Sequence, residues 1–365
     1  MKRKLLPLLI AGASAVSAST VFAAGPTVYG KINLTVHKND FQSVAGGQAV
    51  DNIDNWSMES NASRLGVKGD FDISTQLKAI YKLEYEIATD DGVTGNGREF
   101  SARNIYGGLQ GGWGTLIAGR NDTPLKLAQG DVDRFNDLPV ADIQNIMVGE
   151  NRADNMIMYS TPDFSGFGFT LGLVQGEDDG VTAGQDNDSL TDSISAAATY
   201  TSKSLYLALA ADSNVNKSTD ALRLVAEYSF GPAKIGGIYQ TAEGHEDYDV
   251  ISSVRGDISS FDADLNPTPA TAVGFDEQTA YILNGEVKLG GPWKLKAQYG
   301  YSESSTASGF DDAEATLMAL GVDYSLNKNA KLFAYYAQLE TEGDAAFTTD
   351  TVEDKTFAVG FDYKF

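Results

Sequence analysis

Hydrophobic and polar residues alternate with a period of two along most of the chain. In residues 76–87 every second residue from Leu77 onward is apolar, and the residues between them are polar or charged, apart from Ile80. Residues 293–301 and 356–365 repeat this alternation. Successive side chains of a strand point to opposite faces, so the pattern predicts β-strands with one apolar face. No helical stripe of period 3.6 competes over a comparable length.

Two kinds of connection separate the predicted strands. Short turns rich in Gly, Pro, Asn, Asp and Ser are expected at 72–74, 111–112, 163–165, 202–204, 231–232, 290–292 and 326–329. Long polar loops are expected at 39–62, 90–97, 121–151, 176–190, 214–218, 245–275, 303–310 and 341–350. Seven turns and eight loops predict sixteen strands, with both chain termini on the short-turn side. An even strand number with one short end and one long end is typical of transmembrane β-barrels.

Aromatic and charged residues favour a membrane barrel over a β-sandwich, which also has one apolar face. Aromatic residues gather near the ends of the apolar faces, as in the aromatic girdles of barrels. They include Tyr85, Tyr228, Phe230, Tyr299, Tyr301, Tyr363 and Phe365. Charged pairs such as Arg64 with Lys68, and Arg223 with Glu227, lie in mid-strand on the polar faces. We therefore predict an all-β, transmembrane antiparallel barrel of about sixteen strands.

The N-terminus has the features of a secretory signal peptide. Lys2, Arg3 and Lys4 precede a short apolar stretch at 5–16, and residues 21–23 provide a cleavage site. The apolar stretch is shorter than the roughly 20 residues that a membrane-spanning helix needs. We predict a signal peptide at 1–23 and one barrel domain at 24–365. Cleavage would take the net charge from −23 to −26, because the signal peptide carries three basic residues.

Composition excludes several classes of function. The acidity argues against nucleic acid binding, which needs a basic face. The chain has no cysteine, so it contains neither disulfides nor a thiolate nucleophile. Its two histidines, His37 and His245, leave little for metal sites, and no cofactor is expected. Acidic stretches at 177–179 and 186–188 suggest weak divalent cation binding that bridges lipopolysaccharide phosphates, although neither matches a calcium-binding loop.

Four segments resemble the general porins of Gram-negative bacteria, the trimeric sixteen-stranded family. Residues 63–69 (SRLGVKG) resemble the second strand of these porins, and residues 101–120 resemble the fourth and fifth strands. Residues 152–155 (RADN), with Tyr159 and Pro162, resemble the sixth strand. The alternation at 357–365, which ends in Phe365, resembles the signal read by the barrel assembly machinery. The resemblance covers the whole mature chain.

This resemblance implies a homotrimer in the outer membrane, in which each barrel has its own pore. It also implies that the third long loop, 121–151, folds inward and that its acidic residues face a row of arginines on the wall. The matching arginines are Arg64, Arg103 and Arg152, and the candidate loop acids are Asp131, Asp133, Asp137 and Asp142. The Pro-Glu-Phe-Gly-Gly loop tip of enteric porins is replaced here by residues 137–142, DLPVAD. Arg120, at the loop end of a strand, is interpreted as structural, as an inter-subunit anchor.

The sequence therefore predicts a passive channel for ions and small hydrophilic solutes with a mild preference for cations. Facing lipid at mid-depth would cost an arginine about 2–4 kcal/mol, so the wall arginines must point into water. A substrate-specific channel for a sugar, carboxylate or phosphate is the alternative, although neither an aromatic slide nor an Arg/Lys ladder is evident. An adhesin and a barrel enzyme are less well supported. An enzyme would need His37 or His245 as a base, and no Gly-x-Ser-x-Gly motif is present.

Overall fold

A computed structural model describes residues 25–45, 48–94, 97–176, 191–216, 219–244, 275–306, 313–343 and 351–365. The predicted signal peptide, His245 and the acidic stretches at 177–179 and 186–188 lie outside these ranges. No helix among the described residues is both long and apolar enough to cross a membrane.

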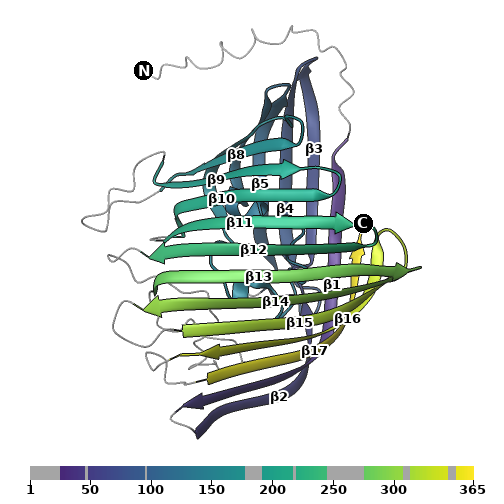
Figure 1. Ribbon diagram of the computed structural model, residues 1–365. Helices are drawn as coiled ribbons and strands as arrows, with labels where there is room; N and C mark the ends of the chain where they lie inside the picture. Colours follow the sequence, from purple (N-terminus) through teal and green to yellow (C-terminus); the bar gives the residue numbers. More distant parts are fainter. Residues whose placement is uncertain are drawn as a thin grey trace, which may run out of the picture.

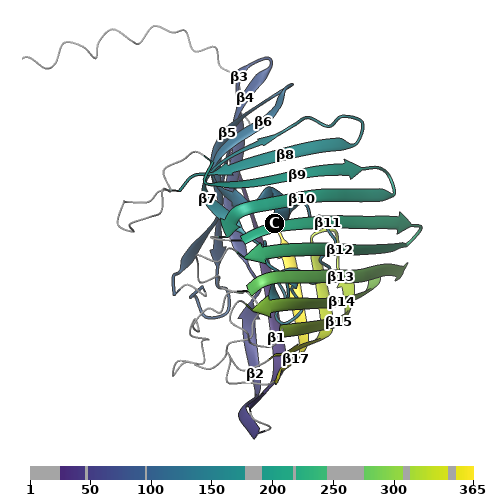
Figure 2. The same cartoon turned by 60° about the vertical axis from the view of Figure 1, so that its left-hand side comes forward.

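The described chain forms one antiparallel sheet that curls round and closes on itself (Figures 1 and 2). The strands are β1 Thr27–Ala45, β2 Gln48–Ser60, β3 Arg64–Ser74, β4 Leu77–Ile87, β5 Phe100–Gly111, β6 Gly114–Asp122, β7 Arg152–Ser160, β8 Phe167–Val174, β9 Ser193–Thr201, β10 Leu205–Asn216, β11 Thr219–Phe230, β12 Ala233–Gly244, β13 Phe275–Gly290, β14 Trp293–Thr306, β15 Ala313–Ser325, β16 Ala330–Glu342 and β17 Thr351–Lys364. Two short helical segments, α1 Pro124–Leu127 and the 3₁₀ turn η1 Ile143–Asn145, lie between β6 and β7.

The barrel has sixteen wall strands, because β2 and β3 together form one of them. Strand β1 pairs with β2 over its C-terminal part and with β3 over residues 27–31. Between them, Ala62 has a φ of 47°. The Asn61 N–H donates to the Asn33 carbonyl at 2.8 Å, so pairing with β1 continues across the interruption. The sixteen-stranded prediction is confirmed.

Strand β1 also pairs with β17 from Lys31 to Val44, which closes the barrel. Beyond this ladder, Gly30 and Phe365 exchange two backbone hydrogen bonds of 3.0 and 3.1 Å. These contacts place the start of β1 and the chain's last residue at the same end of the barrel, the end with the short turns, as the sequence predicts.

The first long loop was predicted wrongly at 39–62. Strand β1 continues to Ala45 and β2 begins at Gln48, so most of this segment is an extended hairpin. Its residues are mainly polar on both faces, for example Asn39, Asp40, Gln42 and Asn52. Backbone pairing with β17 on one side and β2 on the other keeps this polar stretch in the sheet. Polarity alone therefore does not mark the end of a strand.

The outer surface carries the apolar face of the strands. Exposed large residues include Leu83, Leu109, Leu224, Tyr239, Leu283, Leu320, Phe357 and Val359. The ladders run from β1 through β3 and the following strands to β17 and back to β1, so the wall closes without an open sheet edge, and β2 extends it by pairing with β1. Apolar side chains on the outside and closed backbone pairing suit a hydrocarbon environment.

This closed ladder predicts a heat-modifiable protein. In detergent without boiling, the protein should migrate on a denaturing gel as a compact species, because closed barrels have no edge from which unfolding can begin. After boiling it should migrate more slowly, at or slightly below 38.9 kDa. Identical mobility before and after boiling, with a helical circular dichroism spectrum, would contradict the barrel.

Candidate functional site: the pore and its third loop

Residues 123–151, here called the third loop, lie inside the barrel. Thr123 caps α1 by accepting a hydrogen bond from the Lys126 N–H at 3.2 Å. The loop then buries a row of apolar side chains against the inner wall. They are Leu125, Val132, Phe135, Leu138, Val140, Ile143, Ile146, Met147 and Val148.

A large part of the inner wall beneath the third loop is apolar and rich in small residues. Its buried side chains include Ala197, Ala208, Ala210, Ala221, Val225, Ile238, Ala280, Ile282, Ala315, Leu317, Ala319, Phe333, Tyr335, Ala337 and Leu339. On β15 and β16 both faces are thus apolar, which departs from the simple rule of apolar outside and polar inside. The loop needs this surface, because burying apolar area stabilises its packing by about 25 cal/mol per Å².

Inward-facing polar side chains bind the backbone of the third loop. Gln278 accepts from the Val148 N–H at 3.1 Å, and Gln240 donates to the Val148 carbonyl at 2.8 Å. Fully buried Arg223 also donates to that carbonyl, and its guanidinium binds Glu150 at 2.6 Å. Buried backbone groups that would otherwise lack partners are therefore satisfied by the wall.

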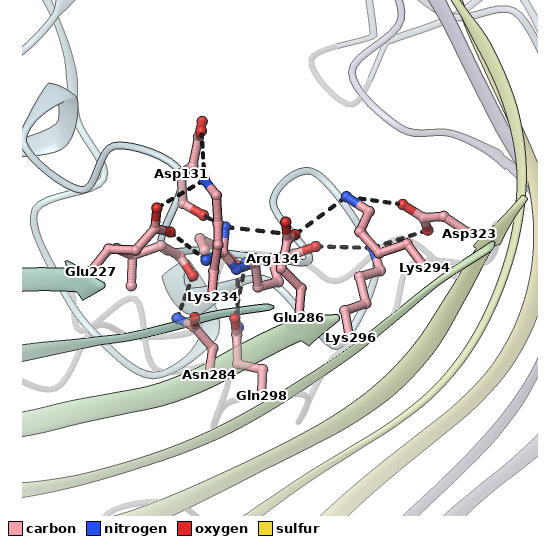
Figure 3. A network of polar contacts seen from close by, with 12 residues as sticks. Asp131, Arg134, Glu227, Lys234, Asn284, Glu286, Lys294, Lys296, Gln298 and Asp323 are labelled. Atoms are coloured by element: carbon pink, nitrogen blue, oxygen red, sulfur yellow. Dashed lines mark hydrogen bonds and ion pairs between the residues drawn. The ribbon is translucent and has the colours of Figure 1, made fainter. Parts of the chain in front are cut away.

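Arg134 ties the loop to several wall strands through its side chain and its backbone (Figure 3). Its guanidinium pairs with Glu227 of β11 and lies 3.8 Å from Glu286 of β13. Its N–H donates to Gln298 at 3.0 Å, and its carbonyl accepts from Lys296 at 2.9 Å. The Arg134 side chain is 4% exposed, so this anchor is buried between the loop and the wall.

The three predicted arginines line the opposite wall and alternate with carboxylates. Arg103 of β5 lies 2.9 Å from Glu86 and 3.4 Å from Glu84, both on β4. Arg152 of β7 pairs with Asp122 of β6 at 2.8 Å. With Arg64 on β3, five successive strands thus present basic and acidic side chains in turn, rather than a bare row of arginines.

Among the predicted loop acids, Asp137 is the one that reaches this wall. Its Oδ2 accepts from Arg64 Nη2 at 2.7 Å and from Lys31 Nζ at 3.0 Å. Burial raises the pKa of the Asp137 carboxyl, but Lys31, Arg64 and Arg103 outweigh this and hold the pKa below its usual value. Asp137 is therefore a fixed negative charge that joins the loop to β1 and β3.

The other three loop acids do not contact the arginines. Asp133 and Asp142 are buried and accept hydrogen bonds from loop N–H groups. Burial raises the pKa of Asp133 to about 6. The Asp131 side chain is 84% exposed and lies 4.0 Å from Lys234, next to the 202–204 turn and away from Arg64, Arg103 and Arg152.

A cavity of about 720 Å³ lies between the third loop and the arginine-bearing wall. The basic residues around it are Arg64, Arg103, Lys126 and Arg152. The acidic residues around it are Glu59, Glu86, Asp122, Asp137, Asp142, Glu150 and Asp354. This polar space between two charged surfaces has the form of a channel constriction.

Two further residues named in the sequence analysis, Arg120 and His37, lie outside the cavity. Arg120 binds Asp154 at 2.6 Å and projects from the same face of β6 as exposed Leu116, on the outside of the barrel. His37 is buried on the inner face, where its Nε2 lies 2.9 Å from the Ser57 hydroxyl. Glu59 approaches the same nitrogen at 3.8 Å. In a catalytic triad the serine faces Nε2 and the acid binds Nδ1. Here Ser57 and Glu59 both approach Nε2, so the three residues do not have the geometry of a triad.

Sequence reasoning missed the partners of the arginines. Glu84 and Glu86 lie on the polar face of the 76–87 alternation, so their inward direction could be read from the period of two. Their place between Arg64 and Arg103 depends on strand register, which β3, β4 and β5 fix by pairing. Lys31 and Arg134 carried no local signal, because their partners are far away in sequence. Arg223 was identified as a polar-face charge, but its partner Glu150 on the third loop was not.

Comparisons with known proteins agree with this architecture. A family model described as Gram-negative porin matches residues 7–344. Outer membrane porin protein 32 of Delftia acidovorans is 26% identical over 298 residues, which cover 78% of this chain and 76% of the relative. An outer membrane porin protein of Bordetella pertussis is 26% identical over 369 residues, which cover 92% of this chain and 93% of the relative.

Two solved structures share the fold. An anion-selective porin from Comamonas acidovorans has a TM-score of 0.65 at 22% identity, with 93% of this chain and 99% of that chain covered. A trimer form of in-vitro folded OmpT from Vibrio cholerae has a TM-score of 0.60 at 17% identity, with 93% and 99% covered.

Proposed function

This chain belongs to the Gram-negative porin family and is an outer-membrane channel, and we propose that it passes ions and small hydrophilic solutes by passive diffusion with a mild preference for cations. The observation that carries this proposal is the charged cavity between the third loop and the arginine-bearing wall. Charged rings in a pore select ions and orient dipolar solutes. Small polar solutes should pass more readily than apolar ones, which cannot replace the lost contacts of oriented water.

The balance of charge around the cavity supports the cation preference. The three wall arginines are each paired with a carboxylate, from the third loop for Arg64 and from the wall for Arg103 and Arg152, so their fields are partly cancelled. Seven acidic and four basic residues surround the cavity, and the acids remain in excess when Asp142, whose pKa is raised well above its usual value, is left out. Distant loop charges are screened beyond about 8 Å at physiological salt, so the narrow section decides the sign of selectivity. The Comamonas porin is named anion-selective, and its sequence is only 22% identical to this one.

We further propose that three copies assemble into a trimer, each with its own pore. A structural relative has been solved in a trimer form, and the outer surface here carries large apolar side chains suited to contacts with lipid and with neighbouring barrels. Cross-linking of detergent-extracted protein tests this assembly, and a monomer alone under conditions that keep the barrel folded would exclude the trimer.

Selectivity can be tested by the reversal potential in planar bilayers under a potassium chloride gradient. The wild-type channel should conduct and favour cations by a modest ratio, and replacing Asp137 by asparagine should move the reversal potential toward anions. The shift should be largest at low salt, where screening is weakest. Asp131→Asn, which removes an equal charge from a residue that does not line the cavity, is the matched control and should shift the potential less. An anion-preferring wild type would show that the arginines dominate the constriction.

A further inference from the structure

The tip of the third loop, residues 137–142, has an unusual backbone. Asp137 and Val140 have φ values of 65° and 63°, in the left-handed region that favours glycine. Such a conformation is a genuine outlier for a β-branched residue such as valine. This conformation is strained and persists only where the surroundings hold it in place. The groups that hold this tip therefore determine where Asp137 lies.

Asp142 makes the most direct of these contacts. Its Oδ2 accepts the Asp137 N–H at 2.8 Å, and its Oδ1 accepts the Gln144 N–H at 2.9 Å. One buried carboxyl group thus spans the tip and fixes both sides of it. The Asp142 residue is 5% exposed, although it borders the cavity.

A second layer of contacts supports Asp142 from the wall. Gln298 of β14 donates to the Ala141 carbonyl at 3.2 Å and to Asp133 at 3.1 Å. Asp133 in turn accepts a hydrogen bond of 3.4 Å from the N–H of Ile143, the residue that follows Asp142. Tyr335 of β16 donates to the Pro139 carbonyl at 3.2 Å. The backbone around Asp142 is therefore fixed to the barrel, while the Asp137 side chain extends from it toward Lys31 and Arg64.

We propose that Asp142 is a positioning residue of the channel: it holds Asp137 in the left-handed backbone conformation that directs the Asp137 carboxylate onto Arg64 and Lys31. In this role Asp142 sets the width and charge of the constriction without acting on permeating ions itself. The proposal rests on the channel function proposed above, and it assigns different roles to two aspartates only five residues apart.

The electrostatics of the two aspartates fit this division. Burial, together with neighbouring Asp133, raises the pKa of Asp142 well above its usual value. The basic residues around Asp137 lower the pKa of that carboxyl. Asp137 is thus the acid that keeps its charge, whereas burial disfavours a charge on Asp142, whose oxygens contact loop N–H groups rather than the wall arginines.

A double-mutant cycle in planar bilayers tests the proposal. The channels are wild type, Asp137→Asn, Asp142→Ala and the double variant, with Asp142→Asn and Asp131→Asn alongside. Asp142→Asn keeps the side-chain size and one acceptor oxygen but removes the ionisable group. Single-channel conductance and reversal potential are measured for each, and gel mobility before boiling confirms that each barrel is folded.

Asp142→Ala should raise the conductance about as much as Asp137→Asn, and the double variant should add nothing, because both changes release the same contact. Asp142→Asn should fall between wild type and Asp142→Ala in conductance, and Asp131→Asn should resemble wild type. Additive shifts in reversal potential, with Asp142→Asn as large as Asp142→Ala, would make Asp142 a pore charge and overturn the proposal. A folded Asp142→Ala channel identical to wild type would overturn it as well. A wild-type protein that does not conduct would instead refute the proposed channel function.

Discussion

Replacing Arg134 by glutamate is expected to release the third loop from the wall and to widen the channel severalfold in conductance. The new carboxylate would lie beside Glu227 and Glu286, where the guanidinium now lies. Glu227 and Glu286 keep Lys234 at 2.9 Å and Lys294 at 3.3 Å, so the main cost is that a third carboxylate is buried among like charges. Single-channel conductance and liposome swelling with sugars of increasing size measure the effect.

Two further variants test whether the effect comes from the loss of the Arg134 ion pair. Lys328→Glu makes the same charge change in the exposed turn between β15 and β16 and should conduct like wild type. The exchange Arg134→Glu with Glu227→Arg restores opposite charges and should recover part of the wild-type conductance. If Arg134→Glu folds and conducts normally, apolar packing alone holds the loop, and the Arg134 anchor is dispensable.

Deleting Phe365 is expected to strongly reduce the amount of protein in the outer membrane. The residue does more than end an alternating strand, because its backbone exchanges hydrogen bonds with Gly30 across the barrel seam. Its ring covers Gly30 so closely that a Cβ there would lie 2.4 Å from a ring carbon. We expect signal-processed but unfolded protein in the periplasm, because the barrel assembly machinery is proposed to read this terminus.

The control separates assembly from stability. The deleted protein, refolded in detergent, should still show a mobility change on boiling, since the ladder between β1 and β17 remains from Lys31 to Val44. Phe365→Tyr keeps an aromatic ring at the terminus and should assemble nearly as wild type. Normal outer-membrane levels of the deletion would refute an assembly role.

Most of the strands were predictable because each of them carries its own signal. The alternation at 76–87 and the Gly-Pro turn at 231–232 are local, and local signals suffice to count strands and order them. The error at 39–62 has a physical cause, since pairing with two neighbours holds a polar segment in the sheet where its own residues give no indication of it.

The candidate site was only partly predictable, because it is made by distant partners. Arg64 and Asp137 were both identified, and the structure brings them together at 2.7 Å. Asp133 and Asp142 are also aspartates of the same loop, yet their carboxyl groups accept hydrogen bonds from N–H groups of the loop itself. Which aspartate reaches the wall depends on the backbone conformation of the loop tip, and residue type alone does not encode that.

The small inner side chains beneath the third loop have a consequence for how this channel can vary. Ala319 and Ala337 never touch a passing solute, yet they set how deeply the loop sinks toward β15 and β16. A bulkier residue at either position would push the loop toward the opposing arginines and narrow the passage. The width of the pore can therefore change through substitutions in the wall beneath the loop, while every charged residue that lines the pore stays the same. Lineages that share one set of constriction residues can thus still differ in the size of solute they admit.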